Sequence, residues 1–156
     1  MGQRVQGTFQ KISRQLIDRM VNEIVTAKVG RYTGRVATGE LKSSFRADID
    51  ENSLGIYSTT PLKANVVDKG RRAGRFAPIA PLMQWASIKG IVPKNNRSIE
   101  QFAFAVSHKL MERGYPGIEY VNKAFLNAES MIVKEIGDAY TLDLEEQLEK
   151  QIPNLK

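Results

Sequence analysis

The stretch TFQKISRQLIDRMVNEIVTAK, residues 8–28, has the clearest periodic pattern in the sequence. Its apolar residues recur at spacings of three, four and one, which places them on one wide stripe of a helix with 3.6 residues per turn. The stripe comprises Phe9, Ile12, Leu16, Ile17, Met20, Val21, Ile24 and Val25. Thr8 is the expected N-cap and Gly30 the expected stop. The pattern predicts a long core helix.

Two short segments that follow this helix alternate between apolar and polar residues, which predicts strands. Their apolar residues are Phe45, Ala47 and Ile49, then Leu54 and Ile56, with the turn formers of residues 50–53 between them. We expect an antiparallel hairpin over residues 45–58. Because two strands alone are only marginally stable in water, the hairpin needs helix 8–28 across one face.

The remaining segments predict further helices. Pro61 is expected to open a short helix that Gly70 ends, and Thr38 to cap a turn before the hairpin. Later helices are expected from Pro81 to Gly90, from Ser98 to Gly114, where Ser98 and Gln101 form a capping box, and from Ile118 to about Ile136. We also expect helix 8–28 to pack on the helices around Trp85 and Phe102. The predicted fold class is α+β: a long N-terminal helix packed on a small antiparallel sheet, with further helices in the C-terminal half.

Length and composition suit one soluble domain. The chain has 156 residues, of which 42% are hydrophobic and 26% charged. It has no cysteine, which excludes disulfides and thiolate metal sites. No apolar run approaches the roughly 20 residues that span a bilayer, and the N-terminus lacks the apolar core of a signal peptide. We expect one α+β domain over residues 1–140 and a charged helical tail over residues 141–156, with no contact with a membrane.

Charge is distributed unevenly. Residues 1–46 contain nine Lys and Arg against three acids, and residues 63–99 contain eight against one. Residues 100–156 contain six against ten. Such asymmetry is typical of contact with a polyanion or of head-to-tail contact between copies, and an ordinary solvated surface is the alternative.

Nothing in the sequence calls for catalysis. His108 is the only histidine, and general acid–base chemistry usually needs a histidine or paired carboxylates in a pocket. Zinc and non-haem iron sites recruit more than one His or Cys. There is no P-loop, dinucleotide fingerprint or nucleophile elbow. We therefore expect no catalytic, cofactor-binding or metal-binding residues and no cofactor. The rival, a small enzyme, would require a pocket that joins His108 to a carboxylate.

The densest positive charge lies in DKGRRAGRFAPIAPLMQW, residues 68–85. Its cations are Lys69, Arg71, Arg72 and Arg75, on a loop predicted over residues 68–79. They are suited to phosphate contacts, but Phe76 is the only aromatic among them, and no recognition helix accompanies them. A loop of this length is also suited to act as an arm that binds the acidic surface of a neighbouring subunit. We favour the second interpretation, with the acidic C-terminal third as that surface.

Three stretches together resemble a known family. TGELKSSF, residues 38–45, precedes the hairpin, and ANVVDKGRRAGR, residues 64–75, leads into the basic loop. The third stretch has two parts, APIAPLMQWASIKGI, residues 77–91, and FAVSHKLMERGYPGIEYVNKAF, residues 104–125. In order, these parts contain prolines, a predicted helix with the tryptophan, a second predicted helix, a Gly-x-Pro motif and a closing helix. In this order, over about residues 5–137, the chain resembles the tail-completion or head–tail connector proteins of the necks of tailed bacteriophages.

The resemblance implies an α+β fold, no enzymatic activity and a place in the virion neck after assembly in the host cytoplasm. Members of the family form rings around the DNA channel, so six or twelve copies are expected between the portal–adaptor assembly and the tail. The partners implied are further copies of the chain, portal or adaptor proteins, tail proteins and, without sequence specificity, packaged DNA. Lys69, Arg71, Arg72 and Arg75 would contact DNA or a neighbouring subunit. The alternative is a stand-alone nucleic-acid-binding protein that uses loop 68–79.

Overall fold

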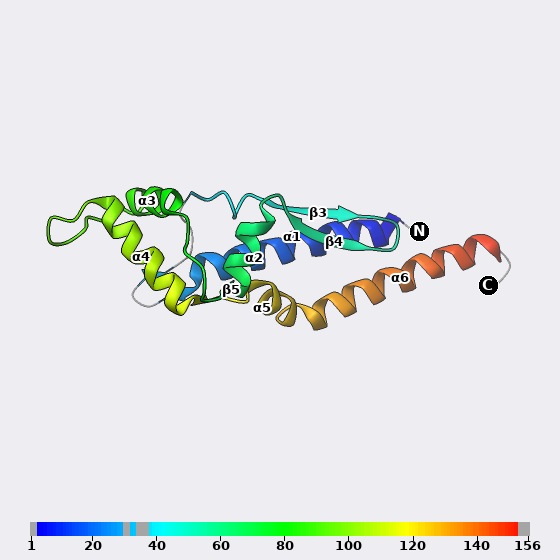
Figure 1. The fold of residues 1–156 in the computed structure, drawn as a ribbon. Helices are drawn as coiled ribbons and strands as arrows, with labels where there is room; N and C mark the ends of the chain where they lie inside the picture. Colours follow the sequence, from blue (N-terminus) through cyan, green and yellow to red (C-terminus); the bar gives the residue numbers. More distant parts are fainter. Residues whose placement is uncertain (1–2, 30–31, 34–37, 153–156) are drawn as a thin grey trace. The chain divides into compact units, whose positions relative to one another are not determined.

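The fold is α+β, as the sequence predicts. A computed structural model describes residues 3–29, 32–33 and 38–152. Its elements, in chain order, are α1 (Gln3–Thr26), β1 (Lys28–Val29), β2 (Tyr32–Thr33), β3 (Phe45–Ile49), β4 (Leu54–Ser58), α2 (Pro61–Lys69), β5 (Gly70–Arg71), α3 (Ile79–Ile88), α4 (Ile99–Arg113), β6 (Tyr115–Pro116), α5 (Tyr120–Leu126) and α6 (Glu129–Gln151) (Figure 1). The strands form three separate antiparallel pairs: β1 with β2, β3 with β4, and β5 with β6.

The chain divides into two compact units. Unit 1 comprises Met1–Glu23, Ser44–Thr59 and Tyr120–Lys156, and unit 2 comprises Ile24–Ser43 and Thr60–Glu119. Unit 1 is therefore assembled from three separate parts of the chain. The division predicted from the sequence, a domain over residues 1–140 and a tail over residues 141–156, would place its boundary inside α6.

In unit 1, α1 begins at Gln3, five residues before the expected N-cap. Thr8 lies inside the helix, so its prediction as a cap is wrong, and Gly30, the expected stop, lies outside the described residues. The physical reason is that the buried stripe extends back to Val5, which is 1% exposed. The Val5 N–H, one of the first-turn amides without a partner inside the helix, donates to Asp143 Oδ2 of α6 at 3.2 Å.

The predicted hairpin is confirmed. β3 and β4 pair in antiparallel register from Phe45 opposite Ser58 to Ile49 opposite Leu54. The inner residues of the hairpin pack on α1: Ile49 and Leu54 contact the cluster of Val5 and Phe9, and Ile56 contacts that of Ile12 and Leu16. At the other end, the ring of Phe45 meets the edge of the Tyr120 ring at 5.8 Å. The hairpin thus obtains from α1 the apolar cover that two strands require.

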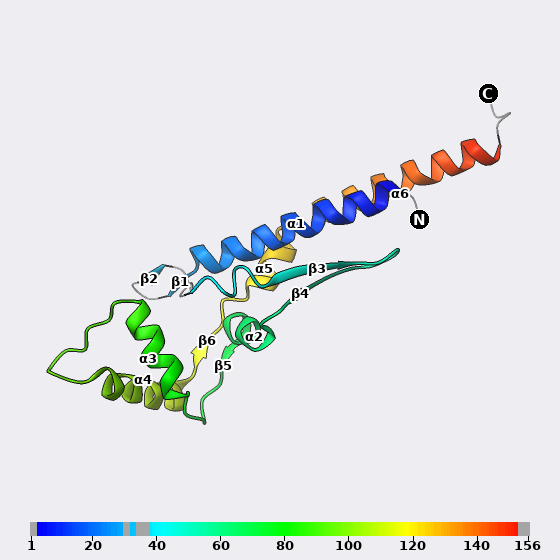
Figure 2. The ribbon, with the colours of Figure 1, turned by 90° about the horizontal axis from the view of Figure 1, so that it is seen from above.

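The last helix differs from the prediction. The sequence predicts a helix from Ile118 to about Ile136 and a helical tail over residues 141–156, whereas α5 ends at Leu126 and α6 runs without interruption from Glu129 to Gln151. Ile136 and Ala139 of α6 pack on Val5 and Phe9, so burial on both sides of Gly137 keeps the helix continuous. In Figures 1 and 2, α6 lies alongside α1, and its last turns extend beyond the N-terminal end of α1.

Helix 8–28 is also expected to pack on the helices around Trp85 and Phe102. Its end lies in unit 2, where Ile24 lines one pocket with Trp85 and Ile88 of α3. In unit 1, α6 and its N-cap Ala128 complete the core, through Ala128, Ile132 and Ile136. The apolar stripe predicts that a partner exists but does not identify it.

In unit 2, α3 packs on α4, and each contributes a fully buried alanine, Ala86 and Ala103. The predicted capping box of α4 is confirmed, because Ser98 Oγ accepts from the Gln101 N–H and the Gln101 side chain accepts from the Ser98 N–H, both at 3.1 Å. The expected ends of α2 and α4, at Gly70 and Gly114, are also observed. α3 begins at Ile79, two residues before the expected proline start.

Candidate interaction surface

The basic loop of unit 2 starts in a short β ladder. Gly70 pairs with Pro116 and Arg71 with Tyr115. Next to this ladder, the Ile118 and Glu119 N–H groups donate to the Val67 and Asp68 carbonyls at 3.1 and 2.9 Å. Carbonyls of the last turn of α2, which have no partner within the helix, are satisfied in this way. The segment predicted to be a loop over residues 68–79 is therefore held in place where it begins.

Three glycines make this close approach possible. A Cβ on Gly70 would collide with the Tyr115 carbonyl, one on Gly117 with the Asp68 carbonyl, and one on Gly114 with the Arg71 carbonyl. Gly114 also has a φ of +61° and a ψ of −157°, a conformation that L side chains rarely adopt. Only glycine at these three positions lets the loop backbone lie directly against the chain that follows α4.

The middle and end of the loop are attached to α4. The Gly74 N–H donates to the Met111 carbonyl at 2.7 Å, and Ser107 Oγ donates to the Ala77 carbonyl at 2.7 Å. Ser107 and Ala77 are both buried. Arg71 closes the loop on itself, since its guanidinium donates to the carbonyls of Arg75 and Phe76 at 3.0 and 2.8 Å. The loop is thus a shaped surface laid along α4.

The four predicted cations have different surroundings. Lys69, Arg72 and Arg75 are exposed, whereas Arg71 is half-buried and uses its guanidinium to shape the loop. Lys69 Nζ lies 3.2 Å from a carboxylate oxygen of its neighbour Asp68, which is buried. Lys69, Arg72 and Arg75 are therefore the cations that this loop presents to solvent.

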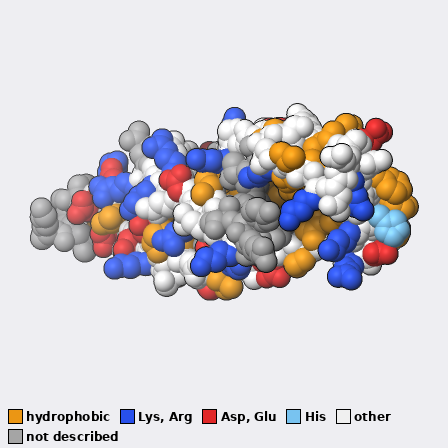
Figure 3. Space-filling view, turned by 90° about the vertical axis from the view of Figure 1, so that its left-hand side faces the viewer, with side chains coloured by type: hydrophobic (Ala, Val, Ile, Leu, Met, Phe, Trp, Pro, Cys, Tyr) orange, Lys and Arg blue, Asp and Glu red, His pale blue; other side chains and the backbone are white. Residues whose placement is uncertain are grey.

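An aromatic cluster adjoins these cations. The Phe76 and Phe104 rings stack with centroids 6.3 Å apart and planes inclined by 20°, and the His108 ring meets Phe76 edge-on at 6.0 Å. Phe76 and Phe104 are 52% and 57% exposed, which is unusual for phenylalanine. In Figure 3, hydrophobic and basic side chains gather beside the pale blue side chain of the only histidine. We define the basic–aromatic surface as Lys69, Arg72, Arg75, Phe76, Phe104 and His108.

His108 belongs to this surface. Its Nδ1 lies 3.4 Å from Glu112 Oε1 one turn along α4, and both side chains are about half exposed, at 49% and 52%. Over residues 3–29, 32–33 and 38–152, no cluster of three or more His, Cys, Asp or Glu side chains is suited to hold a metal ion. In the same ranges, no helix is both long and apolar enough to cross a membrane.

The charge asymmetry of the sequence follows the two units. Unit 1 contains nine Lys and Arg and twelve Asp and Glu, a net charge of −3, and unit 2 contains fourteen and five, a net charge of +9. In α6, the segment from Gly137 to Glu149 has five acids and no Lys or Arg. One chain therefore carries two surfaces of opposite sign.

Sequence reasoning located the cations but missed the rings beside them. Phe104, His108 and Glu112 repeat every four residues on α4, which indicates one helix face. Nothing local indicates that Phe76, 28 residues earlier, joins that face. The two hydrogen bonds between the loop and α4, one donated by Gly74 and one by Ser107, bring the rings together.

Comparisons with known proteins assign no family. No protein-family model, curated protein or solved structure matches the chain.

Proposed function

We propose that this protein is a structural subunit of the neck of a tailed bacteriophage. Copies would form a ring that joins the portal and adaptor of the head to the tail around the DNA channel. The order of the three resembling stretches suggests this function, and one observation carries it: two compact units of opposite net charge, −3 and +9, lie in the same chain.

Opposite charge on two parts of one chain favours contact between unlike patches. In such a heterologous contact, the acidic patch of one copy meets the basic patch of the next, and each copy keeps one patch free for a further copy. If the rotation between neighbours closes, the product is a ring. Complementary charge also raises the rate of encounter and disfavours contact between two identical patches.

The basic–aromatic surface has a defined role in this proposal. Lys69, Arg72 and Arg75 contact oxygen anions, which are the carboxylates of a neighbouring subunit or the phosphates of DNA in the channel. Contacts of this kind to phosphate position a protein without reading base sequence. No catalytic role is assigned to the protein, and its place is the virion neck after assembly in the host cytoplasm.

Electron microscopy of the purified protein, alone and with portal and tail proteins, tests the proposal. We expect rings for the wild type and loss of rings when Lys69, Arg72 and Arg75 are replaced by alanine. Arg71 is left unchanged because it shapes the loop. The matched control replaces three exposed cations of unit 1, Arg14, Lys123 and Lys134, and removes the same charge. Virions that lack the protein at the head–tail junction would refute the neck assignment.

The cluster of Phe76, Phe104 and His108 favours a second function, stand-alone nucleic-acid binding. Exposed rings next to arginines suit unpaired bases, since each stacked base contributes about 1–3 kcal/mol and each phosphate contact adds a salt-dependent increment. A gel shift of single-stranded DNA by the isolated chain, weakened by salt and by Phe104→Ala, would support it. A neck subunit that acts only in assembly should give no such shift.

A further inference from the structure

Unit 2 contains an apolar groove of about 280 Å³. Val66 and Val67 of α2, Trp85 and Ile88 of α3, and Leu41 of the turn before the hairpin line it. Val66, Trp85 and Ile88 are 37%, 37% and 46% exposed, although they are large hydrophobic residues. The volume lies just below the range of ligand pockets, roughly 300–1,000 Å³, and suits a few side chains better than a large cofactor.

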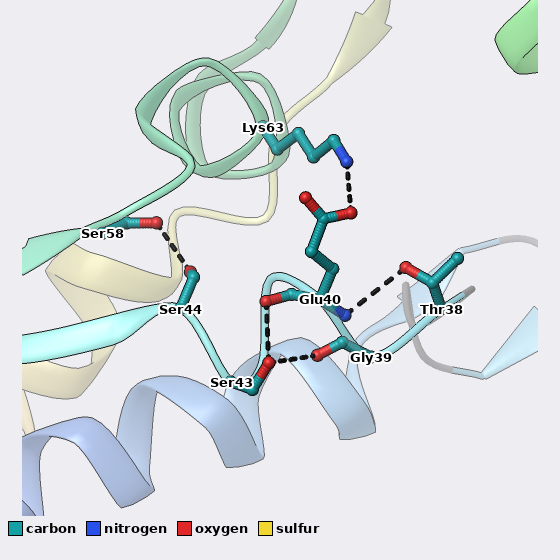
Figure 4. Close-up of polar contacts among 7 residues, drawn as sticks. All are labelled: Thr38, Gly39, Glu40, Ser43, Ser44, Ser58 and Lys63. Atoms are coloured by element: carbon teal, nitrogen blue, oxygen red, sulfur yellow. Dashed lines mark hydrogen bonds and ion pairs between the residues drawn. The ribbon is translucent and has the colours of Figure 1, made fainter.

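The rim of the groove is positively charged. Lys42 and Lys63 both border it, against the single acid Glu40. Figure 4 shows Lys63 reaching from α2 to the carboxylate of Glu40 on the turn, where the two form an ion pair. The same turn is held by Thr38 Oγ1, which accepts from the Glu40 N–H at 3.4 Å. An ion pair and a hydrogen bond therefore fix the turn that borders the groove. The groove belongs to a unit with a net charge of +9.

Unit 1 presents a convex counterpart on α6. Val133, Tyr140, Leu144 and Leu148 are 68%, 38%, 57% and 55% exposed. Their spacings of seven, four and four place them on one stripe, because each helical residue advances by about 100°. We call these four residues the α6 stripe. Ala139, which is buried, lies about 100° around the helix from Tyr140 and packs on α1, as does the partly buried Ile136 beside the stripe.

Acids flank the α6 stripe on one side. Asp138, Glu145 and Glu149 are exposed and lie roughly 60–100° around the helix from the nearer edge of the stripe, and no Lys or Arg lies between Gly137 and Glu149. A helix with an apolar stripe and an acidic flank thus complements the charge of an apolar groove with a basic rim. Amphipathic helices bind grooves in this way through residues spaced by three, four and seven.

We propose that the α6 stripe of one copy occupies the unit 2 groove of a second copy. The inference rests on the proposed function, since it identifies the patches through which copies meet. Both patches belong to the same chain, so one contact leaves a stripe and a groove open at its two ends. The resulting contact is heterologous and propagates to further copies until a ring closes.

Two single substitutions test the pairing. Leu144→Glu breaks the stripe, and Ile88→Glu breaks the groove. Each should raise the dissociation constant of self-association, measured by sedimentation velocity, by roughly 30-fold or more, as removal of a central interface residue does. In a 1:1 mixture, the intact groove of the first variant binds the intact stripe of the second. The mixture should therefore form heterodimers and stop there.

Matched controls exclude general effects of the added charge. Leu142→Glu introduces a glutamate on α6 about 200° around the helix from Leu144, and Leu142 is 45% exposed. Leu62→Glu does the same on α2 outside the groove, where Leu62 is 82% exposed. Both controls should associate like the wild type. If Leu142→Glu weakens association as much as Leu144→Glu, the stripe is not the contact and the proposal is overturned.

Other outcomes also decide the matter. If both test variants assemble like the wild type, or if their mixture stays monomeric, the stripe and groove do not pair. A wild-type protein that remains monomeric overturns the docking proposal alone, because the neck assignment is judged separately from the location of the protein in virions. A mixture that assembles beyond heterodimers overturns it as well, because copies would then join without an intact stripe and groove between them.

Discussion

Unit 1 buries mostly large hydrophobic side chains, whereas the described part of unit 2 buries mostly alanines. The buried hydrophobic residues of unit 1 are Val5, Phe9, Ile12, Leu16, Met20, Phe45, Tyr120, Ala124, Ala128 and Ala139. Those of unit 2 are Ile24, Ala64, Ala77, Ala86, Ala103 and Ile118. The first set removes much apolar area from water, and the second lets backbones approach one another.

The difference has a physical consequence. Hydrophobic stabilisation scales with the apolar area that is buried, so unit 1 depends on the size of its side chains. Unit 2 depends on small residues, on glycines without room for a Cβ, and on hydrogen bonds such as that from Ser107 to Ala77. Unit 1 should therefore be sensitive to truncation and unit 2 to enlargement. Their surfaces differ as well, one acidic and one basic.

Truncation in unit 1 has the largest expected effect. Leu16→Ala removes a side chain that is 2% exposed and should lower the free energy of unfolding by about 3 kcal/mol, through lost burial and the cavity that remains. Circular dichroism during urea unfolding measures it. The control is Leu62→Ala on the surface of unit 2, expected within about 0.5 kcal/mol of wild type. Equal losses for both would break the comparison.

Enlargement in unit 2 comes next. Gly117→Ala should destabilise by about 2 kcal/mol, because the new Cβ collides with the Asp68 carbonyl and forces the loop from its ladder. Trp85, the only tryptophan, lies in unit 2, so its fluorescence follows this unfolding. The matched change in unit 1, Gly137→Ala, meets open space inside α6 and should stabilise by about 1 kcal/mol. The same sign for both changes would contradict this account.

A single hydrogen bond between helices of unit 1 has a smaller effect. Asp143→Ala removes the carboxylate that accepts the Val5 N–H at 3.2 Å and should cost about 1 kcal/mol, the usual loss of a helix N-terminal cap. Asp143→Asn keeps an acceptor oxygen and should lower the free energy of unfolding by less. Asp138→Ala, on the exposed side of α6, serves as the control. Thermal unfolding followed by circular dichroism ranks the three variants.

The smallest expected effect concerns pH. The hydrogen bond from Lys150 at 2.7 Å, then the charges of Lys150 and Arg4, hold the pKa of Glu146 below its usual 4.5. A lowered pKa means that Glu146 stabilises the fold at pH values above 4.5 and loses this contribution as the pH falls through the lowered value. Titration by NMR should show the Glu146 pKa rising toward 4.5 in Lys150→Met, and no change in Lys134→Met.

Much of the local structure could be predicted from the sequence. The stripe of α1, the alternation of β3 and β4 and the capping box of α4 each depend on residues close together in the chain. Helix ends at Gly70 and Gly114 follow from the same short-range rules. The expected cap at Thr8 was wrong because a partner from the other end of the chain, Asp143, lets α1 start earlier.

The candidate surface divides in the same way. The sequence by itself determined the composition of the basic loop, the acidic character of α6 and the periodicities of the helices. Tertiary structure alone decided that the loop lies along α4, that Phe76 stacks on Phe104, and that acid and base separate into two units. Periodicity reports which face of an element is apolar. Which faces meet depends on contacts between residues far apart in the chain. It also depends on close approach of backbone segments, which produces no periodic pattern in the sequence.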